Sequence, residues 1–360
     1  MRDVKFLVMG DTKEKRFHTY TELLKNFNIP HQAIDYVELI NGKAVIPEVG
    51  GKVIVRLCSP WYNSELIDYF HQIGKDKETF DYEIKKGDDF YSSTPKTTNG
   101  FLKFLETIDS KIKEKIETPL FVNPSNEIYM GRNKILMYKN FEKKSIPHPK
   151  TYLNVRKPAE IFNLYNQSNH SSLFVKIHSG SLGRGIAIID QEGVYTATKK
   201  KNGRFFSGQN IKKLKTDSEI EETLQFLLDM YSVVQEGINL AKINKKNFDF
   251  RHYVSHDHFT ISILRVSKKK VTNEAMGGEI VRGEDISNYL RQEQISRSKD
   301  LATKAFKGFE SLDLAIDIGF DSEFNNAYCL EVNFLPGLNY PEKPYTFEIQ
   351  RNLEMLGNKS

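Results

Sequence analysis

Residues Cys329–Asn339 read CLEVNFLPGLN, and this stretch says most about the fold of the chain. Its apolar residues and those just before it indicate a β-strand, which places Glu331 and Asn333 two residues apart near the strand's end. Side chains alternate between the two faces of a strand, so these two point the same way. A carboxylate beside an amide oxygen offers the hard oxygen ligands that Mg²⁺ prefers.

A second apolar segment, LDLAIDIGF at residues 312–320, adds Asp317, fourteen residues before Glu331. If the two predicted strands are neighbours in one sheet, three oxygen ligands converge on one point. This arrangement predicts a metal site of the kind that binds a nucleotide, with Asp317, Glu331 and Asn333 as the metal ligands.

The segment Phe174–Gly185, FVKIHSGSLGRG, is the candidate phosphate-binding element. Lys176 lies near the end of a predicted strand, and a glycine-rich turn follows it. Such a turn can direct backbone amides toward phosphate oxygens, while the lysine adds a positive charge. The alternative is a hairpin turn that binds nothing, because the Walker A order of lysine and serine or threonine after the glycines is missing. The cofactor-binding candidates in this turn are Ser179, Gly180, Ser181, Gly183 and Gly185.

Two further segments offer groups to a nucleotide. The short apolar run Tyr231–Gly237, YSVVQEG, ends in Gln235 and Glu236, which can face an adenine edge. Lys134, at the start of a predicted helix over 133–144, is another candidate for a phosphate contact. Each signal is weak alone, because strands often end in polar residues and most lysines on helices are solvated.

Two arginines on neighbouring predicted strands are candidates for catalysis. Arg251 lies in DFRHYV at residues 249–254, and Arg265 lies on the next strand. A guanidinium suits carboxylate and phosphate oxygens and can stabilise charge that develops during phosphoryl transfer. The alternative is a surface ion pair between Arg251 and Asp249, which lies two residues away on the same face.

The order of these elements resembles the ATP-grasp superfamily over roughly residues 123–339, and the part before it resembles the domain that usually precedes that fold. DFRHYV and the two C-terminal segments are most similar to the ribosomal-protein α-L-glutamate ligase branch. Ala315 stands where D-alanine–D-alanine ligases usually carry an arginine, which argues against that branch. Many members bind ribose with an acid soon after the position of Glu236, where this chain offers only Asn239 and Asn244.

The resemblance implies an ATP-dependent carboxylate–amine ligase that forms an amide or peptide bond through an acylphosphate and releases ADP and phosphate. The implied cofactors are ATP and two Mg²⁺ ions, with Mn²⁺ as a substitute. The two lysines would contact the phosphates, the glycine-rich turn would close as a lid, and the two arginines would hold the substrate carboxylate. The partners would be small-molecule or peptide carboxylates and amines, and relatives of this kind often form homo-oligomers.

The implied fold class is α/β with α+β character: an ATP-grasp fold that follows an N-terminal pre-ATP-grasp α/β domain. In the first part, strands alternate with helices, which predicts a largely parallel sheet. We expect an α/β domain over 1–120, a central subdomain with the lid over 121–231 and a C-terminal subdomain with the metal site over 232–360. Residues 75–99 and 196–215 are polar and are expected to be loops.

Charge and composition narrow the range of functions. The 52 Lys and Arg exceed the 47 Asp and Glu by a formal +5, an excess that an anionic substrate such as ATP explains as well as nucleic acid does. No apolar run reaches the length of a membrane span, and the apolar start is too short for a signal peptide. Cys58 and Cys329 lie beside apolar residues and are expected to be reduced thiols of a cytoplasmic protein without nucleic-acid or membrane partners.

Two other functions stay open on these residues, namely a nucleotide-binding regulator without activity and a kinase that phosphorylates a hydroxyl group. A zinc site is the less favoured reading of His252, His256 and His258, because no cysteine or fourth ligand accompanies them. We expect these histidines in turns or at the surface.

Overall fold

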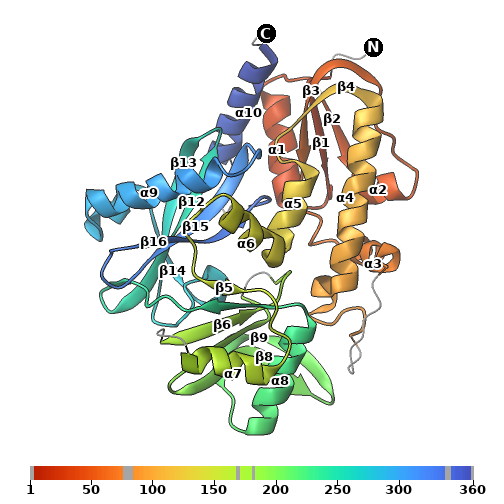
Figure 1. Cartoon of the computed structure of the whole chain (residues 1–360). Helices are drawn as coiled ribbons and strands as arrows, with labels where there is room; N and C mark the ends of the chain where they lie inside the picture. The colour runs from red at the N-terminus through yellow and green to blue at the C-terminus, as the bar shows by residue number, and fades with distance from the viewer. Residues whose placement is uncertain (1–3, 76–83, 168–170, 181–182, 337–341, 358–360) are drawn as a thin grey trace.

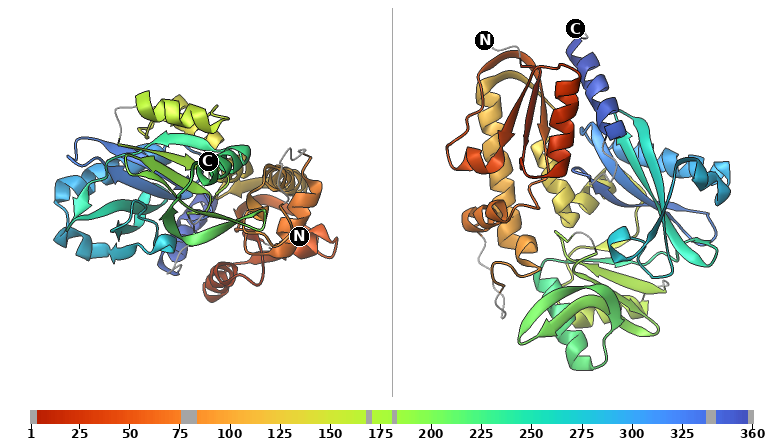
Figure 2. Two further views of the ribbon diagram at one scale, coloured as in Figure 1. Left: turned by 90° about the horizontal axis from the view of Figure 1, so that it is seen from below. Right: turned by 180° about the vertical axis from the view of Figure 1, so that it is seen from behind.

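The structure of the chain is a computed structural model, and it describes residues 4–75, 84–167, 171–180, 183–336 and 342–357. Three β-sheets with their helices make up these residues (Figure 1). Figure 2 shows the first and last units side by side, with the middle unit across one end of both. No described helix is both long enough and apolar enough to span a membrane.

The N-terminal unit is a parallel sheet covered by helices on both faces. Its strand order is β2-β1-β3-β4, as the alternation of strands and helices predicts. Alternate residues of the first strand enter different cores: Phe6 and Val8 pack with the helix residue Phe17, whereas Leu7 and Met9 join the largest core cluster. The elements are β1 (Phe6–Gly10), α1 (Lys15–Asn26), β2 (His31–Asp35), α2 (Tyr36–Ile40), β3 (Val49–Leu57), α3 (Ser64–Ile73), α4 (Pro95–Lys115) and β4 (Ile116–Phe121).

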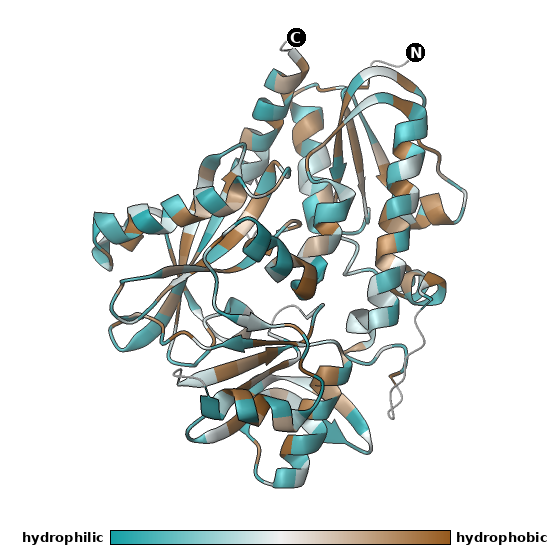
Figure 3. Ribbon diagram, viewed as in Figure 1, coloured by the Kyte–Doolittle hydropathy of each residue, from teal (hydrophilic) through white to brown (hydrophobic). Residues whose placement is uncertain are grey.

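Helix α4 begins earlier than the sequence suggests, so the expected loop over 75–99 is only partly correct. Residues 76–83 lie outside the described residues, Tyr91–Ser93 form a short 3₁₀ turn, and the helix starts at Pro95. The Thr94 hydroxyl accepts a hydrogen bond from the backbone of Thr97, and proline is well suited to the first helical position. The long helix carries both hydrophobic and hydrophilic residues along its length (Figure 3), as expected for a helix with one face on a core.

The middle unit is an antiparallel sheet in the order β5-β10-β6-β7-β8-β9. The expected loop over 196–215 is wrong, since most of it forms the β8–β9 hairpin at the edge of this sheet. Lys199–Lys201 are exposed residues at the end of β8, where the strand pairs with the edge strand β9 beside the hairpin turn. The elements are β5 (Thr151–Tyr152), α7 (Pro158–Gln167), β6 (Ser172–Lys176), β7 (Ile186–Asp190), β8 (Gly193–Lys201), β9 (Arg204–Lys213), α8 (Asp217–Asp229) and β10 (Val233–Glu236).

The C-terminal unit is a second antiparallel sheet, in the order β14-β13-β12-β15-β16, with β11 paired to β12. Helix α9 packs against β12, β15 and β16, so one face of this sheet is core. Helix α10 contacts α1 and β3 of the first unit as well as β12 and β13. The elements are β11 (Lys242–Ile243), β12 (Lys246–Ser255), β13 (His258–Ser267), β14 (Glu279–Arg282), α9 (Gln292–Phe306), β15 (Asp313–Phe320), β16 (Ala327–Asn333) and α10 (Glu342–Gly357).

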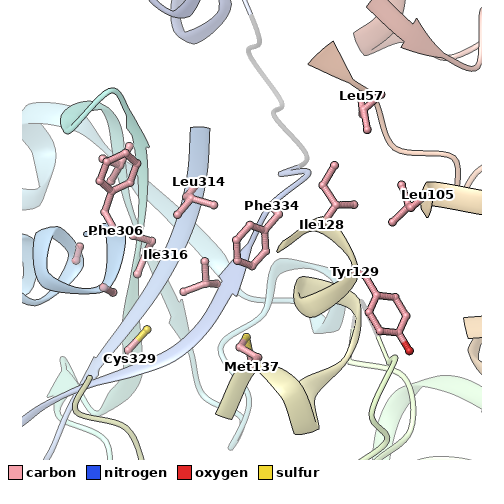
Figure 4. Packing of buried hydrophobic residues seen from close by; sticks show 14 of the residues in the cluster. Leu57, Leu105, Ile128, Tyr129, Met137, Phe306, Leu314, Ile316, Cys329 and Phe334 are labelled. Carbon is pink, nitrogen blue, oxygen red and sulfur yellow. The ribbon is translucent and has the colours of Figure 1, made fainter. Parts of the chain in front are cut away.

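Two short helices, α5 (Ser125–Arg132) and α6 (Lys134–Lys143), connect the cores of the first and last units. Phe334, just after β16, lies beside Ile128 of α5 and near Met137 of α6 (Figure 4). The largest core cluster therefore runs from the parallel sheet through these helices to the C-terminal sheet. Val233 and Val234, which we expected in the C-terminal unit, belong to the middle sheet through β10. The division into three domains stays a proposal.

Candidate active site

The three predicted metal ligands lie together on one face of the C-terminal sheet. Strands β15 and β16 are antiparallel, with Asp317 opposite Glu331 and Ala315 opposite Asn333. The neighbouring Ile316 has the opposite orientation and joins the core that includes α9. The expectation that two adjacent strands bring three oxygen ligands together is thus met in the backbone register.

A β-bulge changes the side-chain direction of the residues next to these carboxylates. Glu331 pairs with Asp317 while Cys329 pairs with Ile318, which leaves Leu330 without a partner in the register. A bulge of this kind lets two consecutive side chains face the same side. Leu330 and Glu331 both line one cavity, and the Tyr138 hydroxyl donates to the Leu330 carbonyl at 3.0 Å. The sequence analysis missed Leu330, because a bulge leaves no mark in a strand pattern.

Asp317 is held by the two arginines that were predicted to be catalytic. Arg251 lies directly opposite it across β12 and β15 and donates to both carboxylate oxygens, at 2.7 and 2.8 Å. Arg265 approaches one of the same oxygens at 2.9 Å. Burial favours a neutral carboxyl group, but the two guanidinium groups outweigh burial and lower the pKa of Asp317.

Arg265 also binds Asp249, with which it forms two hydrogen bonds of 2.7 and 2.5 Å. The Thr272 hydroxyl donates to the same carboxylate at 2.7 Å. The alternative of a surface pair between Asp249 and Arg251 is therefore wrong: each acid pairs with an arginine on a neighbouring strand, and Asp249 is buried. The result is a chain of alternating charges, Asp249, Arg265, Asp317 and Arg251, that leads into the site.

The two candidate lysines face these acids from the other side, with Lys134 buried and Lys176 half-buried. Lys134 is the first residue of α6, where Asn133 caps the helix, and its ammonium donates to Glu331 at 2.7 Å and to the Gly180 carbonyl at 3.1 Å. Lys176 ends β6 and donates to the side-chain oxygen of Gln235 at 2.6 Å. Burial and the charge of Lys134 lower the pKa of Lys176 to about 8. Lys134 is only 8% exposed, so the alternative of a solvated helix lysine is wrong.

The glycine-rich turn contributes fewer residues to the site than we expected. Gly180 and Gly183 line the same cavity as the lysines, and Gly183 has a φ of 76° that favours glycine. Ser179 is buried elsewhere, because its hydroxyl donates to the Ser93 carbonyl at 2.8 Å. Gly185 packs against Ile177 and does not line the cavity. Ser181 lies outside the described residues.

These groups surround a cavity of about 170 Å³ between the middle and C-terminal sheets. Its polar lining includes Asp317, Glu331 and both lysines, as well as Gln235 and Glu236 at the end of β10. The Glu236 carboxylate accepts a hydrogen bond from the Tyr152 hydroxyl at 2.6 Å. The apolar part of the wall consists of Phe174, Ile177, Ile186, Ile238, Leu240, Val271 and Leu330. An apolar space beside a cationic end is suited to a nucleotide.

A larger cleft of about 780 Å³ adjoins this cavity and shares Gly180, Arg184, Arg265, Asn273 and Glu331 with it. Its walls come from the N-terminal unit, from α5, from the glycine-rich turn and from the C-terminal sheet. Three glutamates face six arginines in this lining, namely Arg16, Arg132, Arg184, Arg251, Arg265 and Arg282. The sequence predicts only Arg251 and Arg265, because the other four come from separate segments that only the fold brings together.

The oxygen donors of Asp317, Glu331 and Asn333 fit a hard cation such as Mg²⁺. The side-chain nitrogen of Asn333 is buried without a hydrogen-bond partner, so this amide is not committed to another group through that atom. Within the described residues, no group of three or more His, Cys, Asp or Glu is arranged to hold a metal ion. The proposed site does not count as such a group, because its third ligand is the amide of Asn333. The expectation that the three histidines lie in turns or at the surface is wrong for His252, which is buried within β12 and bonds Ser262 and Ser298. His256 bonds Asn352 instead, so these two histidines do not share a site.

A family model described as YheC/D like ATP-grasp matches residues 132–356, which include all three oxygen ligands. The chain belongs to this family. The predicted membership of the ATP-grasp superfamily is thereby confirmed, and with it the predicted fold class. Comparison with curated protein sequences gives no match.

Solved structures share the fold of this YheC/D-like ATP-grasp chain over nearly its whole length. The ATP-grasp ligase PsnB, in complex with a phosphomimetic variant of its minimal precursor, Mg and ADP, is 14% identical, with a TM-score of 0.58 over 98% of this chain and 100% of that one. D-cycloserine synthetase DcsG is 11% identical, with a TM-score of 0.58 over 96% and 99%. The macrocyclase MdnC from Microcystis aeruginosa MRC, bound with precursor peptide MdnA, is 13% identical, with a TM-score of 0.55 over 99% and 100%.

Proposed function

We propose that this chain is an ATP-dependent carboxylate–amine ligase, which forms an amide or peptide bond and converts ATP to ADP and phosphate. One observation carries the proposal: Asp317 and Glu331 line a single cavity together with Lys134 and Lys176. Acids on one side can hold a cation, and ammonium groups on the other can hold phosphates. The ATP-grasp family and the ligases of the same fold support this reading.

The cavity suggests how the nucleotide is oriented. We assign the adenine to the apolar wall between Phe174 and Leu330, with Gln235 and Glu236 at its edge. The phosphates then reach Lys134 and Lys176, and the backbone of Gly180 and Gly183 lies beside them. Binding of the phosphates requires Lys134 to exchange its bond to Glu331 for bonds to the nucleotide, which frees that carboxylate for a cation.

Asp317, Glu331 and Asn333 would hold Mg²⁺, with two ions as the proposed number and Mn²⁺ as a substitute. When bound, the cation supplies neutralising charge to the phosphates of ATP. Arg251 and Arg265 keep Asp317 ionised and fix its orientation, and they also line the larger cleft. We propose that their outer N–H groups hold the substrate carboxylate next to the γ-phosphate.

The reaction then proceeds in two displacements. An oxygen of the substrate carboxylate attacks the γ-phosphorus, and the bond from that phosphorus to the ADP oxygen breaks, giving an acylphosphate and ADP. The amine nitrogen attacks the acyl carbon, phosphate leaves, and the nitrogen releases a proton, giving the amide. The cavity walls and the glycine-rich turn exclude water, which would otherwise hydrolyse the acylphosphate. Free thiols at Cys58 and Cys329 support the proposal of a cytoplasmic enzyme.

Trapping with hydroxylamine tests the acylphosphate directly. The purified chain is incubated with ATP, Mg²⁺, a panel of amino acids and acidic peptides, and hydroxylamine in place of the amine. We expect ADP and an acyl hydroxamate in equal amounts. A stable phosphate ester of a hydroxyl substrate would instead identify a kinase, and nucleotide binding with no ADP from any acid would identify a regulator.

A further inference from the structure

Arg132, the last residue of α5, is a cleft arginine without an acidic partner. Its guanidinium lies over the ring of Trp61, 3.9 Å from the ring centroid, and donates to the Ser92 carbonyl at 3.1 Å. Its Nε atom is sealed from solvent and has no hydrogen-bond partner. Among the residues that the structure describes, no carboxylate forms an ion pair with it. A guanidinium held in this way still has donors to offer to a ligand.

Arg184, in the glycine-rich turn, adds a second positive charge nearby. It lines both cavities, and within the described chain no ion pair neutralises it either. Burial, and then the charge of Arg184, lower the pKa of Arg132 to about 9. The repulsion between these two guanidinium groups is unfavourable unless an anion comes between them.

Other arginines of the cleft differ in this respect. Arg251 binds Asp317, Arg265 binds Asp249, and Arg16 binds Glu14 at 2.6 Å. Their charges are thus neutralised inside the protein, and Arg16 also stacks on Tyr62. Arg132 and Arg184 have no such neutralisation, although both lie on the same cleft as Glu331.

We infer that Arg132 and Arg184 form a subsite for a second carboxylate of the substrate, in addition to the one that is activated. The substrate class is then an acid with at least two carboxylates, of which an acidic peptide best fills a cleft of about 780 Å³. The inference rests on the proposed ligase function. Arg132 lines the larger cleft and not the nucleotide cavity, which favours the substrate over the γ-phosphate of ATP as the source of the anion.

Trp61 is the only tryptophan in the chain, so its fluorescence reports on this subsite in the intact protein. The chain with Mg²⁺ and AMPPNP is titrated with triglutamate, with neutral triglutamine and with inorganic phosphate. We expect saturable quenching or enhancement with triglutamate alone. Arg184→Gln, which leaves the Trp61–Arg132 stack in place, should weaken triglutamate binding at least about tenfold, the loss of one charge-assisted hydrogen-bonded contact.

Arg132→Gln should weaken triglutamate binding similarly when it is measured by calorimetry, since the substitution also alters the fluorescence itself. Arg156→Gln is the matched control, because Arg156 lies over the ring of Tyr231 and takes no part in lining the cleft. Triglutamate binding that is unchanged in both cleft variants would overturn the subsite. So would a loss of AMPPNP affinity with triglutamate affinity unchanged, which would assign the two arginines to the nucleotide.

Turnover separates this inference from the proposed function. With hydroxylamine as the acceptor, acids with two or more carboxylates should support more ADP formation than their monoamides, and Arg132→Gln should remove the preference. Equal rates with monocarboxylates would refute the subsite and leave the ligase intact. Triglutamate binding without ADP from any acid would refute the ligase and leave the subsite.

Discussion

Arg251 and Asp317 lie directly opposite each other on β12 and β15, and the guanidinium donates one hydrogen bond to each oxygen of the carboxylate. Asp317 is only 4% exposed through its side chain, and Arg265 binds it as well. One acid therefore neutralises part of the charge of two arginines while it faces the nucleotide cavity. We propose that the same residue serves both the stability of the sheet and the chemistry of the site.

Asp317→Asn should lower the free energy of unfolding by about 3–5 kcal/mol. The substitution removes the carboxylate that compensates the buried positive charges of Arg251 and Arg265. Urea unfolding followed by circular dichroism measures the change. Asp300→Asn, on the exposed face of α9, is the control and should change stability by less than about 0.5 kcal/mol. Equal stability of the Asp317 variant and the wild type would mean that the arginine pairs are not formed.

Lys176 should make nucleotide binding depend on pH. Its pKa is lowered to about 8, so the ammonium that we propose as a phosphate ligand is charged below that pH and loses its proton above it. The affinity for Mg²⁺–AMPPNP should be constant below pH 8 and should then fall, by up to about tenfold for each pH unit. Calorimetry from about pH 7 to about pH 9.5 measures this slope.

The conservative variant identifies the group responsible for this slope. Lys176→Arg carries a guanidinium that stays charged over the whole range, so its affinity should not fall above pH 8. Lys113→Arg, an exposed change on α4, should keep the slope of the wild type. A slope that persists in Lys176→Arg would assign the titration to another group.

A buried cluster between the first and last units should make stability depend on pH. Arg56 of β3 forms ion pairs with Glu348 of α10 and, at 3.5 Å, with Asp313 of β15, while the Tyr20 hydroxyl donates to Glu348 at 2.9 Å. One guanidinium thus serves two buried acids. Burial raises the pKa of Glu348 to about 7. The charge of Arg56 offsets only part of this effect, and the charge of Asp313 adds to it.

The direction of the effect follows from proton binding. Between about pH 4.5 and about pH 7 the folded protein keeps a proton on Glu348 that the unfolded chain has released, so the free energy of unfolding falls as the pH rises through this window. The fall should amount to about 3 kcal/mol. Glu348→Gln should remove it, and Glu354→Gln, an exposed change on the same helix, should not. A flat profile in the wild type would mean that Glu348 is ionised throughout.

The proximity of Asp317, Glu331 and Asn333 was predictable from the sequence because their pattern is local. Glu331 and Asn333 are two residues apart on one strand, so their side chains share a face. Asp317 comes from a second strand nearby in the sequence and completes the set of three oxygen ligands. The lysine candidates were weaker signals, since nothing near Lys134 in the sequence shows that its helix starts beside Glu331. For the oxygen ligands and for the lysines alike, the residue type and the predicted element were sufficient for a hypothesis. The distances between these side chains are known only from the fold.

Features that depend on distant partners could not be predicted. Ser179 bonds Ser93 instead of lining the cavity, Asp249 pairs with Arg265 instead of Arg251, and Trp61 meets Arg132 only because two units pack together. The β8–β9 hairpin was mistaken for a loop because an edge strand carries many polar residues on its exposed positions.

The most direct test of the central claim is ADP formation by Glu331→Gln with ATP, Mg²⁺, hydroxylamine and the acid panel. Because Glu331→Gln leaves the buried Lys134 without its acid, urea unfolding first has to show that the variant is still folded under the assay conditions. We expect ADP formation to fall at least about 100-fold, as for the loss of a group that supports charge on the transferred phosphoryl, while Glu354→Gln keeps full activity. ADP formation at the wild-type rate in Glu331→Gln would contradict the account.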